Sequence, residues 1–161
     1  IEIARPFCRL IKFERLLPAG LRKRQSDPTV LVFAPLSGHH ATLLRDTVRA
    51  LLPHHNVFVT DWVDARMVPI SEGPFHLDDY VNYVQEFIRY LQGQYGNCHI
   101  MSVCQPTVPV LAAVSLILPA AYHYLAGPAA AGDGIPTKYR RSLGACVWML
   151  NRASRIAVAV M

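Results

Sequence analysis

The stretch HIMSVCQPTVPVLAAV, residues 99–114, determines how the fold of this chain is interpreted. Its first part is apolar and β-branched, as in a buried strand, and its last part is an apolar run with helical spacing. Cys104 stands between the two parts, at the carboxyl end of the expected strand. A strand that passes through a sharp turn into a helix, with a small residue such as Ser102 two positions before the reactive group, is the pattern of a nucleophile elbow. The stretch predicts that Cys104 is presented on such a turn.

Strand-like and helix-like stretches alternate ahead of this elbow. Short apolar runs predict strands at 29–36, 56–62 and 97–103, and helical spacing predicts helices at 41–52, 76–91 and 105–118. The second helix is expected to bury a stripe made of Leu77, Tyr80, Val81, Val84, Phe87, Ile88 and Leu91. Such alternation indicates βαβ units and a parallel sheet covered on both faces, in which reactive groups lie at the carboxyl ends of strands.

Composition places the chain among globular proteins. It has 161 residues, 52% of them hydrophobic and 17% charged, which excludes wholesale disorder. No apolar run reaches the ~18 residues of a membrane span, so no transmembrane segment is expected. The four cysteines, including Cys8, Cys98 and Cys146, form no close pair. We therefore expect free thiols, no metal site and a cytoplasmic location.

The net charge of +5 is concentrated at the two ends of the chain. The basic residues there are not interleaved with aromatic ones on one face, so nucleic-acid binding is not expected. Residues 1–26 are interpreted as a basic amphipathic segment, in which PFCRLIKFERLL, residues 6–17, predicts a helix. This helix would pack on the core or, alternatively, adsorb to a lipid-like or granule surface.

An acyl-transfer site also needs N–H donors for the developing oxyanion. The residue after the nucleophile, Gln105, would supply one of them. The second is expected in FAPLSGHH, residues 33–40, where Leu36 is the candidate because Pro35 has no N–H. From the pattern alone, a buried structural thiol is an equal alternative for Cys104, because free cysteine is among the most buried residue types.

Four ordered blocks of the chain closely resemble the intracellular polyhydroxyalkanoate (polyhydroxybutyrate) depolymerases. They are APLSGHHATLLRDTVRALLP (34–53), VFVTDWVDARMVP (57–69), GPFHLDDYV (73–81) and VCQPTVPVLAAVSL (103–116). The resemblance implies an α/β-hydrolase-like fold with Cys104 as the nucleophile. It implies hydrolysis of the ester bonds of stored 3-hydroxyalkanoate polymer in the cytoplasm, with the polymer or granule surface as partner and without a metal or organic cofactor.

Other polar residues near the expected site have two interpretations. The loop after the second strand would either contact substrate or order itself through a carboxylate–arginine cluster; its residues are Asp61, Trp62, Asp64 and Arg66. His39 and His40 lie near the expected oxyanion loop. A catalytic role for either histidine is the less favoured interpretation, because the base of an α/β hydrolase normally follows the nucleophile in chain order.

The sequence after Cys104 holds one histidine, His123, and one acid, Asp133, in the reverse of the α/β-hydrolase order. The resemblance ends near residue 118, and residues 119–161 are Ala-rich and basic. We therefore expect a partial hydrolase-like domain at 27–118 whose C-terminal strands, with the acid and the histidine, are missing. Impaired hydrolysis and an open sheet edge at the third strand, with poor solubility, would follow. The alternative is a genuine but divergent tail.

Two further functions are compatible with the pattern. Polyhydroxyalkanoate synthases also use an elbow cysteine, for acyl transfer from coenzyme A thioesters, although glycine is expected there in place of Pro106. A non-catalytic protein held on granules by its basic amphipathic start belongs to a different class.

Overall fold

A mixed seven-stranded sheet forms the centre of the computed structural model, which describes residues 1–16, 27–36, 43–96, 98–102, 104–125, 147–151 and 156–160. The strands lie in the order β1-β2-β4-β3-β5-β7-β6. Their bounds are β1 Ile3–Ala4, β2 Cys8–Phe13, β3 Thr29–Phe33, β4 Asn56–Trp62, β5 Cys98–Ser102, β6 Val147–Asn151 and β7 Ile156–Val160. Strands β4, β3, β5 and β7 are parallel neighbours, while β1 pairs antiparallel with β2, β2 with β4, and β6 with β7.

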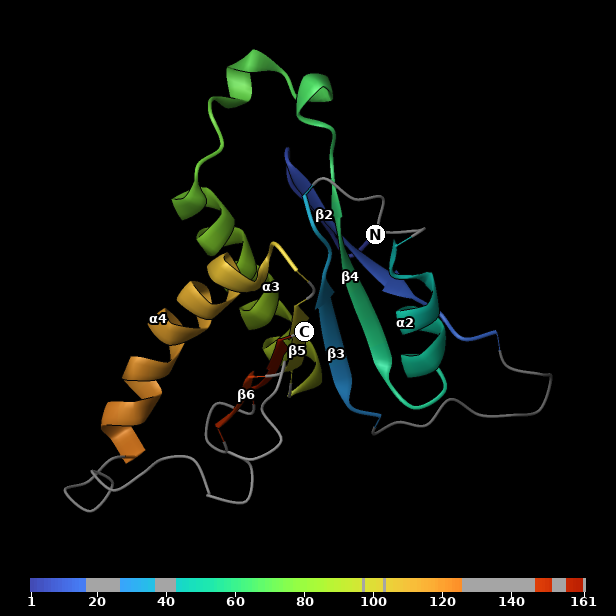
Figure 1. Cartoon of the computed structure of the whole chain (residues 1–161), viewed down its shortest axis with the longest axis vertical. Coiled ribbons are helices and arrows are strands. Elements are labelled where there is room, and N and C mark those ends of the chain that lie inside the picture. The colour runs from blue at the N-terminus through green and yellow to red at the C-terminus, as the bar shows by residue number, and fades with distance from the viewer. Residues whose placement is uncertain are drawn as a thin grey trace.

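Helices cover both faces of this sheet, as Figure 1 shows. They are α2 (Arg45–Leu51), α3 (Leu77–Tyr95) and α4 (Thr107–Leu125), with short 3-10 turns η1 (Ala65–Met67) and η2 (Ile70–Glu72) between β4 and α3. One hydrophobic cluster joins the sheet to α3 and α4, and a second joins the opposite face to α2. The α/β class predicted from the sequence is confirmed. None of the described helices is long and apolar enough to span a bilayer.

Strand β3 shows why a continuous apolar run occupies the middle of the sheet. All five of its residues are buried. Leu31 and Phe33 belong to the cluster with α3 and α4, whereas Val30 and Val32 belong to the cluster with α2. A strand covered on both faces needs apolar side chains at every position, so its sequence does not alternate.

Helix α3 buries the predicted stripe except at its first residue. Its buried side chains are Tyr80, Val81, Val84, Phe87, Ile88 and Leu91. Leu77 is 56% exposed, so its assignment to the stripe is wrong; it lies in the first turn, ahead of the part packed on the sheet. The His76 N–H donates to the Asp79 carboxylate at the start of the helix, and Gly96, with φ 72°, ends it in the left-handed conformation.

The amphipathic helix predicted at 6–17 is wrong, because this segment contains strand β2. Strand β2 pairs antiparallel with β4 from Cys8–Trp62 to Phe13–Val57. Cys8 and Leu10 are fully buried two residues apart, which is strand spacing. A short run of mixed apolar and basic residues is compatible with the spacing of a helix and with that of a strand. Pairing with β4 decides in favour of the strand. The basic side chains have partners here, since Lys12 donates to the Tyr95 hydroxyl at 2.9 Å.

The C-terminal part of the chain also departs from expectation. Strand β7 pairs in parallel with β5 from Cys98–Ile156 to Ser102–Val160, and β6 pairs with β7. The expected open edge at β5 is therefore covered, and the poor solubility inferred from that edge loses its basis. Helix α4 runs to Leu125, past the boundary expected at residue 118. The short apolar runs VWMLN and IAVAV carry these strands within an Ala-rich sequence.

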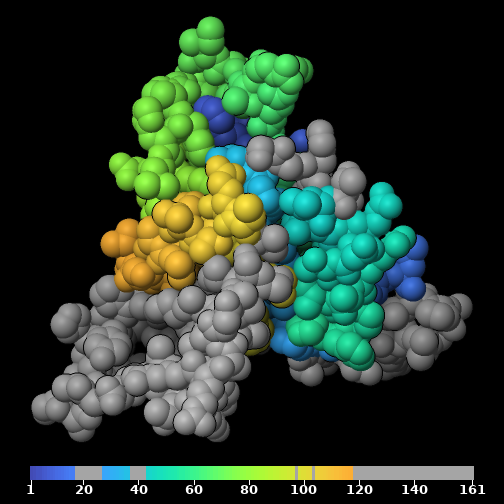
Figure 2. All heavy atoms as spheres, in the orientation of Figure 1, coloured from blue at the N-terminus to red at the C-terminus, as the bar shows by residue number. Residues whose placement is uncertain are grey.

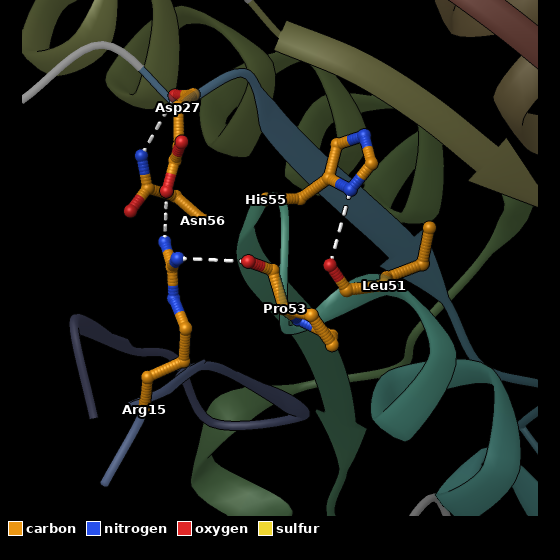
Figure 3. Close-up of polar contacts among 6 residues, drawn as sticks. All are labelled: Arg15, Asp27, Leu51, Pro53, His55 and Asn56. Atoms are coloured by element: carbon orange, nitrogen blue, oxygen red, sulfur yellow. Dashed lines mark hydrogen bonds and ion pairs between the residues drawn. The ribbon is translucent and has the colours of Figure 1, made fainter. Parts of the chain in front are cut away.

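A part-buried ion pair joins the carboxyl end of β2 to the amino end of β3, as Figure 3 shows. Arg15, just after β2, pairs with Asp27, just before β3, and also donates to the Pro53 carbonyl at 3.1 Å. The Asn56 amide donates to the Asp27 carbonyl at 2.9 Å. The side chains of Arg15 and Asp27 are 13% and 6% exposed, so the two opposite charges compensate each other where little water reaches them.

Candidate functional site

Cys104 lies on a tight turn between a strand and a helix. Strand β5 ends at Ser102 and helix α4 begins at Thr107, whose N–H donates to the Cys104 carbonyl at 3.2 Å. Cys104 has φ 68°, and among the described residues no other non-glycine has a positive φ. A left-handed conformation is strained for a residue with a Cβ, and such strain is concentrated at functional sites.

The described thiols differ sharply in exposure. Cys8 and Cys98 are fully buried, while Cys104 is exposed. Burial raises the pKa of the Cys98 thiol to about 12 and also raises that of Cys8. Because the thiolate is the reactive form, these two cysteines are inert core residues. The buried-thiol alternative therefore applies to Cys8 and Cys98 but does not describe Cys104.

The loop after β3 is fixed to β4 by two hydrogen bonds. The Ala34 N–H donates to the Thr60 hydroxyl at 2.8 Å, and the Trp62 indole N–H donates to the Ala34 carbonyl at 2.9 Å. Thr60 is fully buried and Pro35 is buried as well. The backbone is thus held in place immediately before Leu36, on which the predicted second oxyanion donor lies.

Leu36 and Gln105 meet at the carboxyl edge of the sheet, although 69 positions separate them. The Leu36 N–H donates to the Gln105 side-chain oxygen at 2.9 Å. In Figure 2 the yellow atoms at the start of α4 lie against the light blue atoms of the segment after β3. Parallel pairing places the ends of β3 and β5 side by side, with Phe33 opposite Ser102. The two predicted donor residues are therefore neighbours, and the contact between them uses the Gln105 side chain.

Ser102 lies directly beneath the turn. It is fully buried, and within the described residues its hydroxyl has no hydrogen-bond partner. A small side chain lets the turn pack closely against the sheet, as the elbow pattern requires.

Ion pairs lie at the end of β4 and in the loop that follows it. Asp61 pairs with Arg9 at 3.1 Å and Asp64 pairs with Arg66 at 2.6 Å. Hydrogen bonds from Arg66 lower the pKa of Asp64 to about 2. The loop was expected either to contact substrate or to be ordered by a carboxylate–arginine cluster. These ion pairs correspond to the second interpretation. Trp62 packs edge-on against Tyr80, with ring centroids 4.4 Å apart.

Beyond this loop the chain forms an arm, residues 63–76, that projects past the ends of the strands (Figure 1). Met67 and Ile70 on the arm are 77% and 97% exposed. An open hollow of about 350 Å³ lies between residues of the arm and Phe7; its lining is Phe7, Ala65, Val68, Pro69, Ile70, Gly73 and Pro74. No sequence pattern predicted this hollow or the hydrogen bonds that hold the Leu36 loop. The hydrogen bonds could have been suspected from Thr60 and Trp62. These two residues carry hydrogen-bonding groups at the end of a largely apolar strand.

The base that would activate Cys104 is not found among the described contacts. His39, His40 and Asp133 lie outside the described residues, and His123 lies in α4. In the described ranges no residue makes a hydrogen bond with the Cys104 thiol. His99 is near the start of β5, at the edge of the sheet opposite Cys104. Nor do the described histidines, cysteines and carboxylates form a group of three that could hold a metal ion.

Comparison of the chain with family models, with curated proteins and with solved structures found no match in any of the three. The site is therefore interpreted from its geometry.

Proposed function

We propose that the chain is a thiol-dependent carboxylic ester hydrolase, with Cys104 as its nucleophile. The observation that carries this proposal is the exposed Cys104 with φ 68°, on a turn between β5 and α4. The resemblance of four sequence blocks to intracellular polyhydroxyalkanoate depolymerases supplies the substrate class. The proposed substrate is the polyester of cytoplasmic storage granules.

The chemistry would proceed in two steps through a thioester. The Cys104 thiolate attacks the ester carbonyl carbon, and the C=O electron pair moves onto oxygen to give a tetrahedral oxyanion. The N–H groups of Gln105 and Leu36 would donate to that oxygen. Collapse expels the alcohol, which takes up a proton, and leaves the acyl group on sulfur. Water then attacks the thioester, releases the carboxylic acid and returns the thiol.

Three features of the turn support this assignment. The first turn of α4 lies directly behind Cys104, and the N-terminus of a helix favours negative charge. Pro106 is tolerated there because the N–H that it lacks has no partner inside the helix. The bonds from Thr60 and Trp62 hold the Leu36 loop, so one oxyanion donor is fixed before substrate arrives. Removing one such donor typically slows acyl transfer by roughly 10²–10³.

The non-catalytic granule-binding alternative has lost its structural basis. It depended on an amphipathic helix at residues 6–17, and strand β2 occupies that segment. The synthase alternative shares the elbow, but Pro106 stands where that family is expected to carry glycine. Ester hydrolysis therefore remains the better-supported proposal.

The direct test is release of 3-hydroxybutyrate from amorphous poly(3-hydroxybutyrate). Release is expected to be slow, because no described residue serves as the base, so the comparison between variants is decisive. We expect Cys104→Ala to remove the release and Cys98→Ala, which changes a buried thiol, to retain it. Release that survives Cys104→Ala, or no release above buffer by the unsubstituted chain, would contradict the proposal.

A further inference from the structure

The Gln105 side chain forms a hydrogen bond with one of the two proposed oxyanion donors, the N–H of Leu36. Its oxygen accepts from the Leu36 N–H at 2.9 Å. A backbone N–H carries a single hydrogen, so a donor engaged in this way is not available to a second acceptor in the same direction. The Gln105 oxygen thus takes the position on Leu36 that the substrate oxygen would need.

We propose that the Gln105 side chain gates the oxyanion site, closing it at rest and moving away when an ester carbonyl enters. This inference rests on the proposed function, because it assigns a role within the same site. Gln105 then contributes twice: its backbone N–H donates to the oxyanion, and its carboxamide controls access to the N–H of Leu36. In the second role it acts through Leu36 and is a positioning residue.

The surroundings of Gln105 allow this movement. Gln105 is exposed, so its carboxamide can leave Leu36 and be hydrated by water instead. Leu36 does not depend on Gln105 for its place, since Thr60 and Trp62 both hold Ala34, two residues earlier in the loop. In the described part of the chain nothing accepts from the Gln105 N–H, so that donor is open while Leu36 is closed.

Replacement of the Gln105 oxygen by the substrate oxygen at the Leu36 N–H is more favourable in the transition state than in the ground state. A neutral carboxamide oxygen makes an ordinary hydrogen bond, whereas a hydrogen bond to a charged oxygen is roughly twice as strong. The oxyanion can therefore displace Gln105 more readily than a neutral carbonyl can. Because a typical intramolecular hydrogen bond is worth only about a tenfold factor or less, the gate should slow acylation by about two- to tenfold.

The test compares two reactions of Cys104 in the full chain. One is acylation by p-nitrophenyl butyrate, followed as the single-turnover rate of acyl-enzyme formation by mass spectrometry. The other is alkylation by iodoacetamide, which needs the thiolate but no oxyanion donor. Their ratio reports on the oxyanion site after differences in thiol reactivity have been removed.

We expect Gln105→Ala to raise the ratio of acylation to alkylation by about two- to tenfold, since the gate is gone. Gln105→Glu should lower the ratio, because a carboxylate holds the Leu36 N–H more tightly and opposes a second negative charge. Gln94→Ala, the same change at an exposed position of α3, should leave the ratio unchanged. In amide hydrogen exchange, Leu36 should exchange faster in Gln105→Ala than in the unsubstituted chain.

Two results would overturn the gate and distinguish its failure from that of the proposed function. If the unsubstituted chain forms an acyl-enzyme and Gln105→Ala does not raise the ratio, Gln105 is not a gate, although Cys104 is a nucleophile. If iodoacetamide labels Cys104 but no form of the chain becomes acylated, the proposed esterase function fails and the gate fails with it.

Discussion

Replacing Cys104 with glycine should stabilise the fold while removing the proposed nucleophile. Cys104 has φ 68°, in the left-handed region that glycine adopts without steric cost. Its side chain is exposed, so removing the thiol gives up little packing. The strain on the backbone is therefore the main quantity that this substitution changes.

The expected difference in the free energy of unfolding follows from two costs of backbone conformation. A left-handed conformation costs an L-residue about 1–2 kcal/mol. Glycine loses more backbone freedom on folding, which costs about 0.5–1 kcal/mol relative to alanine. Cys104→Gly should accordingly be more stable than Cys104→Ala by roughly 0.5–1 kcal/mol. Cys104→Val should be less stable than Cys104→Ala by about 1 kcal/mol, because a β-branched side chain fits this conformation worst.

Urea denaturation of the three variants, monitored by circular dichroism, measures these differences in the free energy of unfolding. The matched control is Asn82, an exposed residue in the middle of α3. There the order should reverse, with glycine about 1 kcal/mol less stable than alanine. If Cys104→Gly were no more stable than Cys104→Ala, or if valine were tolerated at residue 104, the turn would not be strained and the elbow argument would be refuted.

Three further predictions concern the ion pair, pH and the loop support. Asp27→Ala should lower the free energy of unfolding by roughly 1–3 kcal/mol, because it leaves the part-buried Arg15 charge without its carboxylate; equal stability in a urea titration would contradict the pairing. Desolvation and nearby His55 lower the pKa of His99, so the unfolded chain binds its proton more readily. Stability should therefore fall as pH drops below about 6.5, and His99→Gln should reduce that fall in urea titrations at several pH values. Trp62→Phe, which removes the bond to the loop before Leu36, should slow acylation by p-nitrophenyl butyrate several-fold; an unchanged rate would show that the loop needs no such support.

The parts of the fold with a clear period could be predicted from sequence. Helices α2 and α3 and strands β3, β4 and β5 lie where apolar spacing placed them, to within about four residues at their ends, and α4 begins where predicted but runs on to Leu125. Their alternation predicted that β3 and β5 would be parallel, and they are. In these segments local pattern and burial in the sheet agree, so the local signal is sufficient.

Strands at the two sides of the sheet could not be predicted in the same way. Strand β2 has only six residues, and its apolar positions suit a helix or a strand until pairing with β4 is known. Strands β6 and β7 have five residues each within an Ala-rich sequence that carries no strong period. Pairing partners, which lie far away along the chain, decide the state of such short segments.

Sheet topology predicted which residues of the candidate site lie near one another, but not the contacts that they make. Parallel strands bring their carboxyl ends together, which is why Leu36 and Gln105 could be expected near Cys104. The contact of the Gln105 carboxamide with the Leu36 N–H depends on one side-chain conformation, and no sequence pattern encodes it. The two bonds that hold Ala34 likewise follow from the depth of Thr60 and Trp62 in the fold.

The central claim is that the Cys104 sulfur accepts an acyl group from an ester. The most direct measurement mixes the full chain with p-nitrophenyl butyrate, quenches the reaction in acid and maps the acylated peptide by mass spectrometry. We expect one butyryl group on Cys104 and none on Cys8 or Cys98, which are fully buried. A chain that carries no butyryl group on Cys104, or carries it equally on Cys8 and Cys98, would show that Cys104 is not the nucleophile.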